Sequence, residues 1–221
     1  MKRSIAIEEL AGRITAVSRL HPVRVAIDGV DGVGKTTLAN ELVEPIVKRG
    51  RVVIRASVDG FHNPRHIRYK LGRSSPEGYF RDSFNYDALT ATLLAPLGPG
   101  GSRLYCPAVF NYRTDSEIPT RFETATPDAI LLFDGVFLLR PELLEYWDLK
   151  IFVDAPFNIT VPRMSQRNGK SPDVDAAENR RYVDGQKLYL ELCDPKGAAT
   201  IVVNNEDLTS PELLYAKGLT A

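Results

Sequence analysis

Apolar residues occur along this chain in short continuous runs, and longer segments with helical periodicity separate them. The runs at 23–27, 129–133 and 149–153 predict buried strands, because runs of this length bounded by turn residues are typical of strands covered on both faces. Two more strands are expected at 52–58 and 200–203. Since strands and helices alternate, the chain is predicted to form an α/β fold whose parallel sheet has helices on both faces.

The segments between the apolar runs predict the helices. Apolar residues recur at helical spacing over 4–20, which is typical of an amphipathic helix. The helix after the first strand is expected to end near Arg49, and Pro45 is expected to kink it. Further helices are expected at 66–71, at 86–94, at 141–147, from Ser171–Pro172 to about Leu192, and from Ser210 onward.

Length and charge limit the classes of function. The chain has 221 residues, of which 43% are hydrophobic, so we read 1–221 as a single folded domain. Lys plus Arg number 28, and Asp plus Glu also number 28. Proteins that bind nucleic acids or membrane surfaces generally carry a basic surplus, so we expect neither partner. The oligomeric state stays open, a homo-oligomer included.

Cysteine usage and hydropathy indicate a compartment. Cys106 and Cys193 lie far apart in the sequence, which favours free thiols in a reducing environment. No apolar run approaches the ~20 residues that span a bilayer. Glu8 and Glu9 interrupt what would be the apolar part of a secretion leader. We therefore expect a cytoplasmic protein.

Residues 29–36 match the phosphate-binding pattern G-x-x-x-x-G-K-[ST], with a predicted strand before them and a predicted helix after them. Backbone N–H groups of such a loop surround a phosphate chain, Lys35 reaches its terminal oxygens, and the Thr36 hydroxyl holds Mg²⁺. ATP or GTP is the expected ligand. The residues predicted to bind it are Gly29, Val30, Asp31, Gly32, Val33, Gly34, Lys35, Thr36 and Thr37.

Asp134 follows four apolar residues, and an acid in that position typically joins the Mg²⁺ shell. The alternative is an acid that only caps the turn before Gly135. The residue after Asp134 is not a second acid, and no Asn-Lys-x-Asp sequence occurs. Both absences favour a kinase over a motor or a GTPase. Thr36 and Asp134 are the predicted metal residues.

Asp59 directly follows the second predicted strand and should lie at the same edge of the sheet as the phosphate loop. A kinase that acts on an alcohol needs an acceptor for the hydroxyl proton, so Asp59 is the candidate base. A turn cap is the alternative. His62 and His66 are poor candidates for a zinc site, because Pro64 disfavours a helix between them.

Arg163 and Arg167 are four residues apart on a predicted helix, so they share one face. A mobile basic segment over 163–175 would act as a lid that neutralises charge on the transferring phosphoryl group. An ordinary solvated surface is the alternative.

Several segments resemble the phosphoribulokinase/uridine kinase family of phosphate-loop kinases, and the resemblance extends from residue 23 to about 206. The similar segments are the phosphate loop, Asp59–His62, Phe110–Tyr112, Phe133–Gly135, and Ile151–Asp154 with the arginines that follow it. The resemblance implies a five-stranded parallel sheet and a uridine kinase-like enzyme that uses ATP and Mg²⁺. It implies Lys35, Asp59, Arg163 and Arg167 as catalytic residues.

The resemblance also implies an acceptor-binding region at 59–85 and 102–118. Its candidate residues are Phe61, His62, Arg81, Phe110, Asn111 and Tyr112, although packing in the core is the alternative for the aromatic ones. Asn111 stands where uridine kinases carry an acid. The expected acceptor is a small hydroxyl compound, first a nucleoside such as uridine, with pantothenate, a sugar or a sugar phosphate as alternatives. A nucleotide-gated binding module without transfer activity is the alternative from another class.

Overall fold

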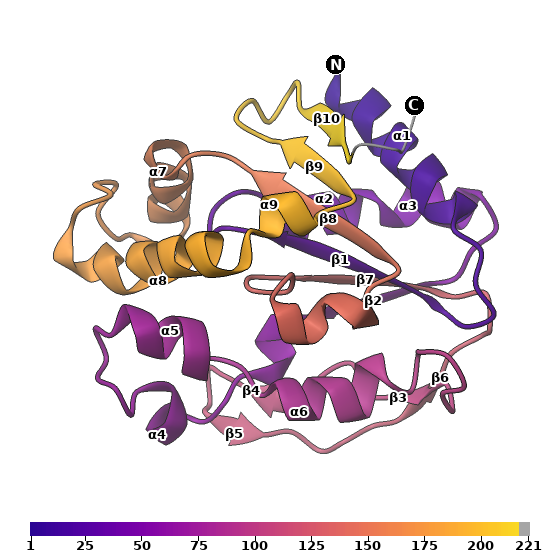
Figure 1. Cartoon of the computed structure of the whole chain (residues 1–221), viewed down its shortest axis with the longest axis horizontal. Coiled ribbons are helices and arrows are strands. Elements are labelled where there is room, and N and C mark those ends of the chain that lie inside the picture. Colours follow the sequence, from indigo (N-terminus) through magenta and orange to yellow (C-terminus); the bar gives the residue numbers. More distant parts are fainter. Residues whose placement is uncertain (217–221) are drawn as a thin grey trace.

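The central sheet of the computed structural model, which describes residues 1–216, has six strands in the order β10-β9-β8-β1-β7-β2 (Figure 1). Five of them run parallel to one another: β1 (Val23–Gly29), β2 (Val53–Ser57), β7 (Ile130–Gly135), β8 (Leu149–Asp154) and β9 (Ile201–Asn204). The predicted α/β fold with a parallel sheet is confirmed. The sixth strand, β10 (Glu212–Tyr215), adds an antiparallel edge.

The helix expected from Ser210 onward is wrong, because β10 occupies that segment. Leu213 and Tyr215 pack against the core, while Glu212 and Leu214, which alternate with them, are exposed. This alternation has the period of a strand that is covered on one face. Residues 217–221, the remainder of the expected helix, lie outside the described residues.

The two faces of the sheet belong to two separate hydrophobic clusters. Along β1, Val25 and Ile27 enter one cluster and Ala26 enters the other, as the period of two requires. Along β7, Leu132 and Phe133 divide in the same way. Burial on both faces explains why these strands are continuous apolar runs in the sequence.

Three helices cover the face that contains Ile27. They are α1 (Arg3–Ala16), α2 (Lys35–Glu41) and α3 (Val43–Lys48). The structure breaks the helix at Leu42, whereas the sequence analysis predicts one continuous helix with a kink at Pro45. The position of the break has a simple cause, because Pro45 has no N–H to donate to the Glu41 carbonyl and its ring crowds that carbonyl.

The opposite face is covered by α5 (Pro76–Asp82), α6 (Tyr86–Leu89) and α8 (Ala177–Cys193), with a π-helical turn at Thr90–Leu94 after α6. The sequence analysis missed α5, although Ser75 caps it and Pro76 begins it. It also began α8 too early. Ser171 and Asp173 lie in a loop, where the Asn179 side chain donates to both of their carbonyls.

The remaining elements are short. Helix α4 (Arg65–Arg68) precedes α5, α7 (Phe157–Asn168) leads from β8 toward α8, and α9 (Pro195–Ala198) precedes β9. A 3₁₀ helix occupies Pro141–Tyr146, where the sequence analysis predicts a helix over 141–147. Two small antiparallel sheets pair β3 (Leu104–Tyr105) with β6 (Glu123–Thr124), and β4 (Phe110–Asn111) with β5 (Ser116–Glu117). Within residues 1–216, none of the helices has the length and apolar character that a membrane span requires.

Candidate active site

The phosphate loop connects the end of β1 to the start of α2, as the sequence motif requires. Gly32 and Gly34 have φ angles of +78° and +102°, in the left-handed region that favours glycine. A Cβ atom on Gly32 would lie 2.2 Å from the Thr160 carbonyl oxygen, so no other residue fits there. The loop therefore turns around a space in which backbone N–H groups can meet an anion.

Lys35 begins α2, and its ammonium group is partly buried. Its Nζ donates to the Val30 carbonyl oxygen at 2.8 Å, which holds the side chain over the loop. Burial lowers the pKa of Lys35, and the carboxylates of Asp31 and Asp28 act in the opposite direction. A phosphate oxygen can replace the Val30 carbonyl as the acceptor, and the charge of the phosphate would then compensate the burial of the ammonium.

The Thr36 hydroxyl donates to Asp134 Oδ2 at 2.6 Å, so the two predicted metal residues lie together. Magnesium prefers oxygen ligands and commonly takes one or two protein oxygens besides water and phosphate, so this pair fits the ion. Arg55 on β2 forms an ion pair with Asp134 Oδ1 at 2.7 Å. The sequence analysis missed Arg55, although it is a charged residue inside a predicted strand.

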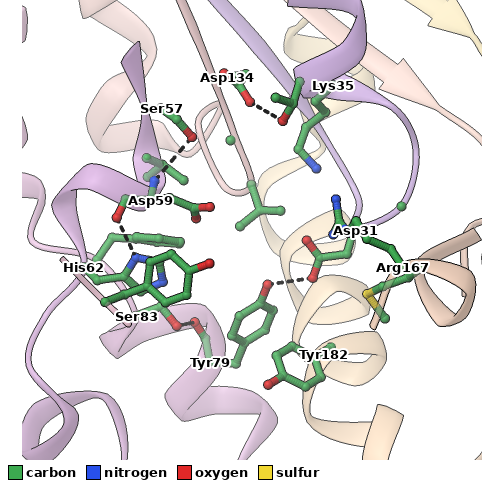
Figure 2. A pocket seen from close by; sticks show the side chains of 18 of the residues that line it. Asp31, Lys35, Ser57, Asp59, His62, Tyr79, Ser83, Asp134, Arg167 and Tyr182 are labelled. Carbon is green, nitrogen blue, oxygen red and sulfur yellow. Dashed lines mark hydrogen bonds between the residues drawn. The ribbon is translucent and has the colours of Figure 1, made fainter. Parts of the chain in front are cut away.

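Asp59 lies in a 3₁₀ turn, Val58–Phe61, that directly follows β2. Figure 2 shows its carboxylate pointing into the cavity, which Lys35 and Asp31 border from another side. Partial loss of hydration at the cavity wall raises the pKa of Asp59, and the nearby carboxylates of Asp31 and Asp134 add to the increase. An elevated pKa brings the carboxylate closer to the range in which a general base works best.

His62 lies beside Asp59, and its Nδ1 is 3.1 Å from the Asp59 carbonyl oxygen. Burial lowers the pKa of His62, which favours a neutral imidazole. The ring also packs near Tyr112, with 4.9 Å between ring centroids. His62 and Tyr112 therefore form one wall of the cavity next to the candidate base.

A single cavity of about 850 Å³ connects the phosphate loop to Asp59. The side that faces away from the loop is lined by residues of α4, α5 and α8, which contribute arginines and tyrosines. The predicted site residues that line the cavity are Asp31, Gly32, Gly34, Lys35, Thr36, Thr37, Asp59, His62, Tyr112, Asp134, Arg163 and Arg167.

Seven predicted site residues do not line the cavity. Gly29, Val30 and Val33 lie on the inner side of the phosphate loop, and both valines are part of the core. Phe61 and Phe110 are also buried, so core packing explains these aromatic residues. Arg81 points to solvent and pairs with Glu77, and the Asn111 side chain accepts from the Arg113 N–H.

The two predicted lid arginines have different surroundings. Arg163 donates to the carbonyls of Asn205 and Glu206 at 3.0 and 2.6 Å, so it joins α7 to the segment after β9. Arg167 has no hydrogen-bond partner for its guanidinium among residues 1–216. Figure 2 shows Arg167 on the same side of the cavity as Asp31. Of the two, Arg167 is therefore the one available to meet a phosphate.

Asp31 is held by side chains of two helices, α5 and α8. Tyr79 of α5 donates its hydroxyl to Asp31 Oδ2 at 2.9 Å (Figure 2). The Asp31 N–H donates to Gln186 Oε1 of α8 at 2.5 Å. Helices α5 and α8 approach closely because Gly185 has no side chain: a Cβ there would lie 2.8 Å from the Pro76 carbonyl oxygen.

Several known proteins are similar to this chain in sequence. A uridine kinase of Leuconostoc citreum is 26% identical over 208 residues, which cover 88% of this chain and 94% of that protein. A uridine kinase of Saccharomyces cerevisiae is 27% identical over 197 residues, which cover 84% of this chain and 38% of that protein, so this chain spans well under half of the yeast enzyme.

Solved structures share the fold. A structure described as a possible uridine kinase from Bacillus stearothermophilus has a TM-score of 0.71 and 23% identity, over 90% of this chain and 97% of that chain. Phosphoribulokinase from Rhodobacter spheroides has a TM-score of 0.57 and 15% identity, over 85% and 71%. The phosphoribulokinase/uridine kinase family profile matches residues 25–172, which is more than half of the chain. The chain belongs to this family and is a phosphotransferase with an alcohol group as acceptor.

Proposed function

We propose that the chain transfers the γ-phosphate of ATP to a hydroxyl group of a small metabolite, with a nucleoside such as uridine as the first acceptor to test. The observation that carries the proposal is the position of Asp59, which lines the same cavity as Lys35 and the Thr36–Asp134 pair. A phosphate chain on the loop would therefore direct its terminal group toward a carboxylate. The relatives named uridine kinase supply the choice of first acceptor.

The proposed reaction is an in-line displacement at the γ-phosphorus. The acceptor oxygen forms a bond to phosphorus, the bond from phosphorus to the β–γ bridging oxygen breaks, and ADP leaves. Asp59 takes the proton of the acceptor hydroxyl. Lys35 and Arg167 stabilise the negative charge that develops on the phosphoryl oxygens. Thr36 and Asp134 would hold Mg²⁺, which supplies charge neutralisation on the phosphates when bound.

The ATP nucleoside would occupy the other end of the cavity, beside the segment after β9. Arg3, Arg163 and Leu208 line the cavity there. Arg3 donates to the Asn205 side chain at 3.1 Å and to the Leu208 carbonyl at 3.1 Å, which fixes this segment to α1. We propose that the adenine ring of ATP packs against these residues.

The test is a coupled assay of ADP release with wild type and Asp59→Asn across a panel of nucleosides and other alcohols. We expect the variant to bind ATP as the wild type does and to lose turnover by ~10²-fold or more. Asp184→Asn is the control, because Asp184 pairs with Lys187 on the surface of α8. Turnover at the wild-type level in Asp59→Asn would contradict the role of Asp59 as the general base. ATP binding that no acceptor converts into ADP release would favour a binding module instead.

A further inference from the structure

Arg68 is a buried cavity-lining arginine with few partners. It belongs to α4 and is 8% exposed. Among residues 1–216, its only side-chain hydrogen bond runs from Nη2 to Asp115 Oδ1 at 2.7 Å, and its Nε is buried without a partner. Buried donors are rarely left unpaired in folded proteins. Arg68 therefore has donors to spare at the cavity wall.

The arginines around Arg68 outnumber the acidic residues that pair with them. Asp115 also pairs with Arg65, at 3.9 Å, so one carboxylate serves two arginines. Arg181 is 7% exposed, lines the same cavity, and forms no ion pair among the described residues. Arg113 adds another guanidinium to the lining. Among the described residues, Asp115 is thus the one acid that forms an ion pair with any of these four arginines.

Part of this charge has a structural use. Arg181 donates to the carbonyls of Ser75 and Arg68 at 3.0 and 3.2 Å, which fixes the connection between α4 and α5 to α8. Its guanidinium also lies over the Tyr69 ring, 5.0 Å from the centroid. Burial lowers the pKa of Arg181, and Arg68 contributes to that decrease. Arg181 is therefore explained by packing, while the free donors of Arg68 are not.

A buried guanidinium with an unpaired donor is costly, and a ligand that accepts from that donor removes the cost. A neutral nucleoside would place no anion beside Arg68. A planar guanidinium with free donors suits a carboxylate or a phosphate, which it can bind through two parallel hydrogen bonds. The position of Arg68 beyond His62 and Asp59 would place such an anion at the end of the acceptor that does not react.

We propose that the acceptor is an anionic alcohol, whose carboxylate or phosphate binds Arg68 while its hydroxyl group faces Asp59. This inference rests on the proposed kinase function, which it narrows from hydroxyl compounds in general to those that carry an acid group. Arg65 and Arg113 would attract the anion at the cavity entrance, where the Arg65 side chain is 54% exposed.

The kinetic test compares acceptors that differ only in the acid group: D-glycerate with glycerol, pantothenate with panthenol, and ribulose 5-phosphate with ribulose, with uridine added. We expect the wild type to prefer the anionic member of at least one pair. In Arg68→Gln, the ratio of kcat/KM for the anionic over the neutral member should fall ~10- to 100-fold, as expected for a charge-assisted hydrogen bond. Arg81→Gln is the matched control, because Arg81 is exposed and lies outside the cavity.

Because the ratio is taken within one preparation, partial unfolding of the variant leaves it unchanged. Arg68→Lys keeps the charge beside Asp115 and should show a smaller loss. Comparison of the carboxylate and phosphate pairs identifies the kind of anion. If only neutral acceptors cause ADP release, at a rate that Arg68→Gln does not alter, the proposed kinase function is supported and the proposal of an anionic acceptor is contradicted.

A binding measurement separates this inference from the proposed function. Calorimetric titration with glycerol 3-phosphate and D-glycerate, after saturation of the phosphate loop with Mg²⁺ and a non-hydrolysable ATP analogue, should show affinity that glycerol lacks and Arg68→Gln loses at least tenfold. Such binding without any ADP release would support the anion pocket and contradict the kinase. Equal binding in wild type and Arg68→Gln, or none beyond that of glycerol, would overturn the pocket.

Discussion

Asp59 titrates in surroundings that oppose its negative charge. Partial loss of hydration at the cavity wall is the largest contribution and raises the pKa of Asp59, and Asp31 and Asp134 raise it further, while His62 and Lys35 lower it. The base works only when it is deprotonated, so activity falls as the pH decreases through this pKa. Because the pKa is raised, that decrease begins above the roughly 3.9 of an unperturbed aspartate.

We therefore predict an acidic limb in the pH profile of kcat/KM with a midpoint above ~3.9. Asp31→Asn should move this limb to lower pH, because the substitution removes a neighbouring negative charge that now raises the Asp59 pKa. ADP release measured from pH 4 to pH 8 with saturating Mg²⁺ and ATP checks both expectations. A limb that stays in place in Asp31→Asn would show that the titrating group is not Asp59.

Single residues of the site differ in how far the sequence predicts them. Asp59 and Asp134 follow strands of a parallel sheet, and the carboxyl ends of such strands meet at one edge, so their common location follows from the pattern. Phe61 and Phe110 fill the core, because an aromatic residue in a loop gives no sign of the direction in which it points. Arg68 depends on a turn that brings Asp115 beside α4, and sequence spacing does not encode that contact.

At the scale of elements, a buried contact ties α8 to the strand that carries the phosphate loop. The Tyr189 hydroxyl donates to Asp28 Oδ2, and the same carboxylate accepts from the Gly29 and Leu139 N–H groups. Burial raises the pKa of Asp28 to about 6 despite these donors. Between ~3.9 and about 6 the folded state binds more protons than the unfolded state, so this group makes stability decrease as pH rises.

Tyr189→Phe should lower the free energy of unfolding by about 1–3 kcal/mol, because it removes a donor to a buried carboxylate. The loss should be greater at pH 8 than at pH 5. Without the hydroxyl the Asp28 pKa rises further, and the charged form at high pH becomes more costly in the folded state.

Urea unfolding at the two pH values measures this difference. Tyr146→Phe is the control, because the Tyr146 hydroxyl forms no hydrogen bond among residues 1–216. We expect this substitution to leave the pH dependence of stability unchanged. Equal losses at both pH values would mean that Tyr189 acts through packing and not through the Asp28 charge.

The elements themselves show which sequence signals suffice. The sequence analysis predicts all five parallel strands, and most of them are apolar runs because burial on both faces leaves little room for polar residues. The start signal Ser210-Pro211-Glu212 predicts a helix, but residues 212–215 form strand β10 and pair with β9 instead. The same kind of signal, Ser75-Pro76-Glu77, does begin a helix at α5. A start signal is local, and tertiary pairing decides whether it is used.

At the scale of the whole molecule, the cavity is built by segments from distant parts of the chain. The phosphate loop and Asp134 form one side, α4 and α5 form the second, and α7 with α8 forms the third (Figure 1). Asp31 already bonds to α5 and α8, so the loop that would hold the phosphates is attached to the acceptor side. A nucleotide bound in the loop would therefore stabilise contacts across the whole domain and not only within the loop.

This arrangement predicts a metal-dependent gain in thermal stability. ATP with Mg²⁺ at about 100 times its Kd should add ~2.7 kcal/mol to the free energy of unfolding, which for a domain of this size raises Tm by roughly 5–10 °C. EDTA should remove most of the increase, because the Thr36–Asp134 pair would hold the ion that neutralises the phosphates. Asp134→Asn should lose the Mg²⁺-dependent part, while Asp184→Asn should behave as the wild type. An equal rise in Tm with and without Mg²⁺ would mean that Asp134 serves its ion pair with Arg55 and holds no metal.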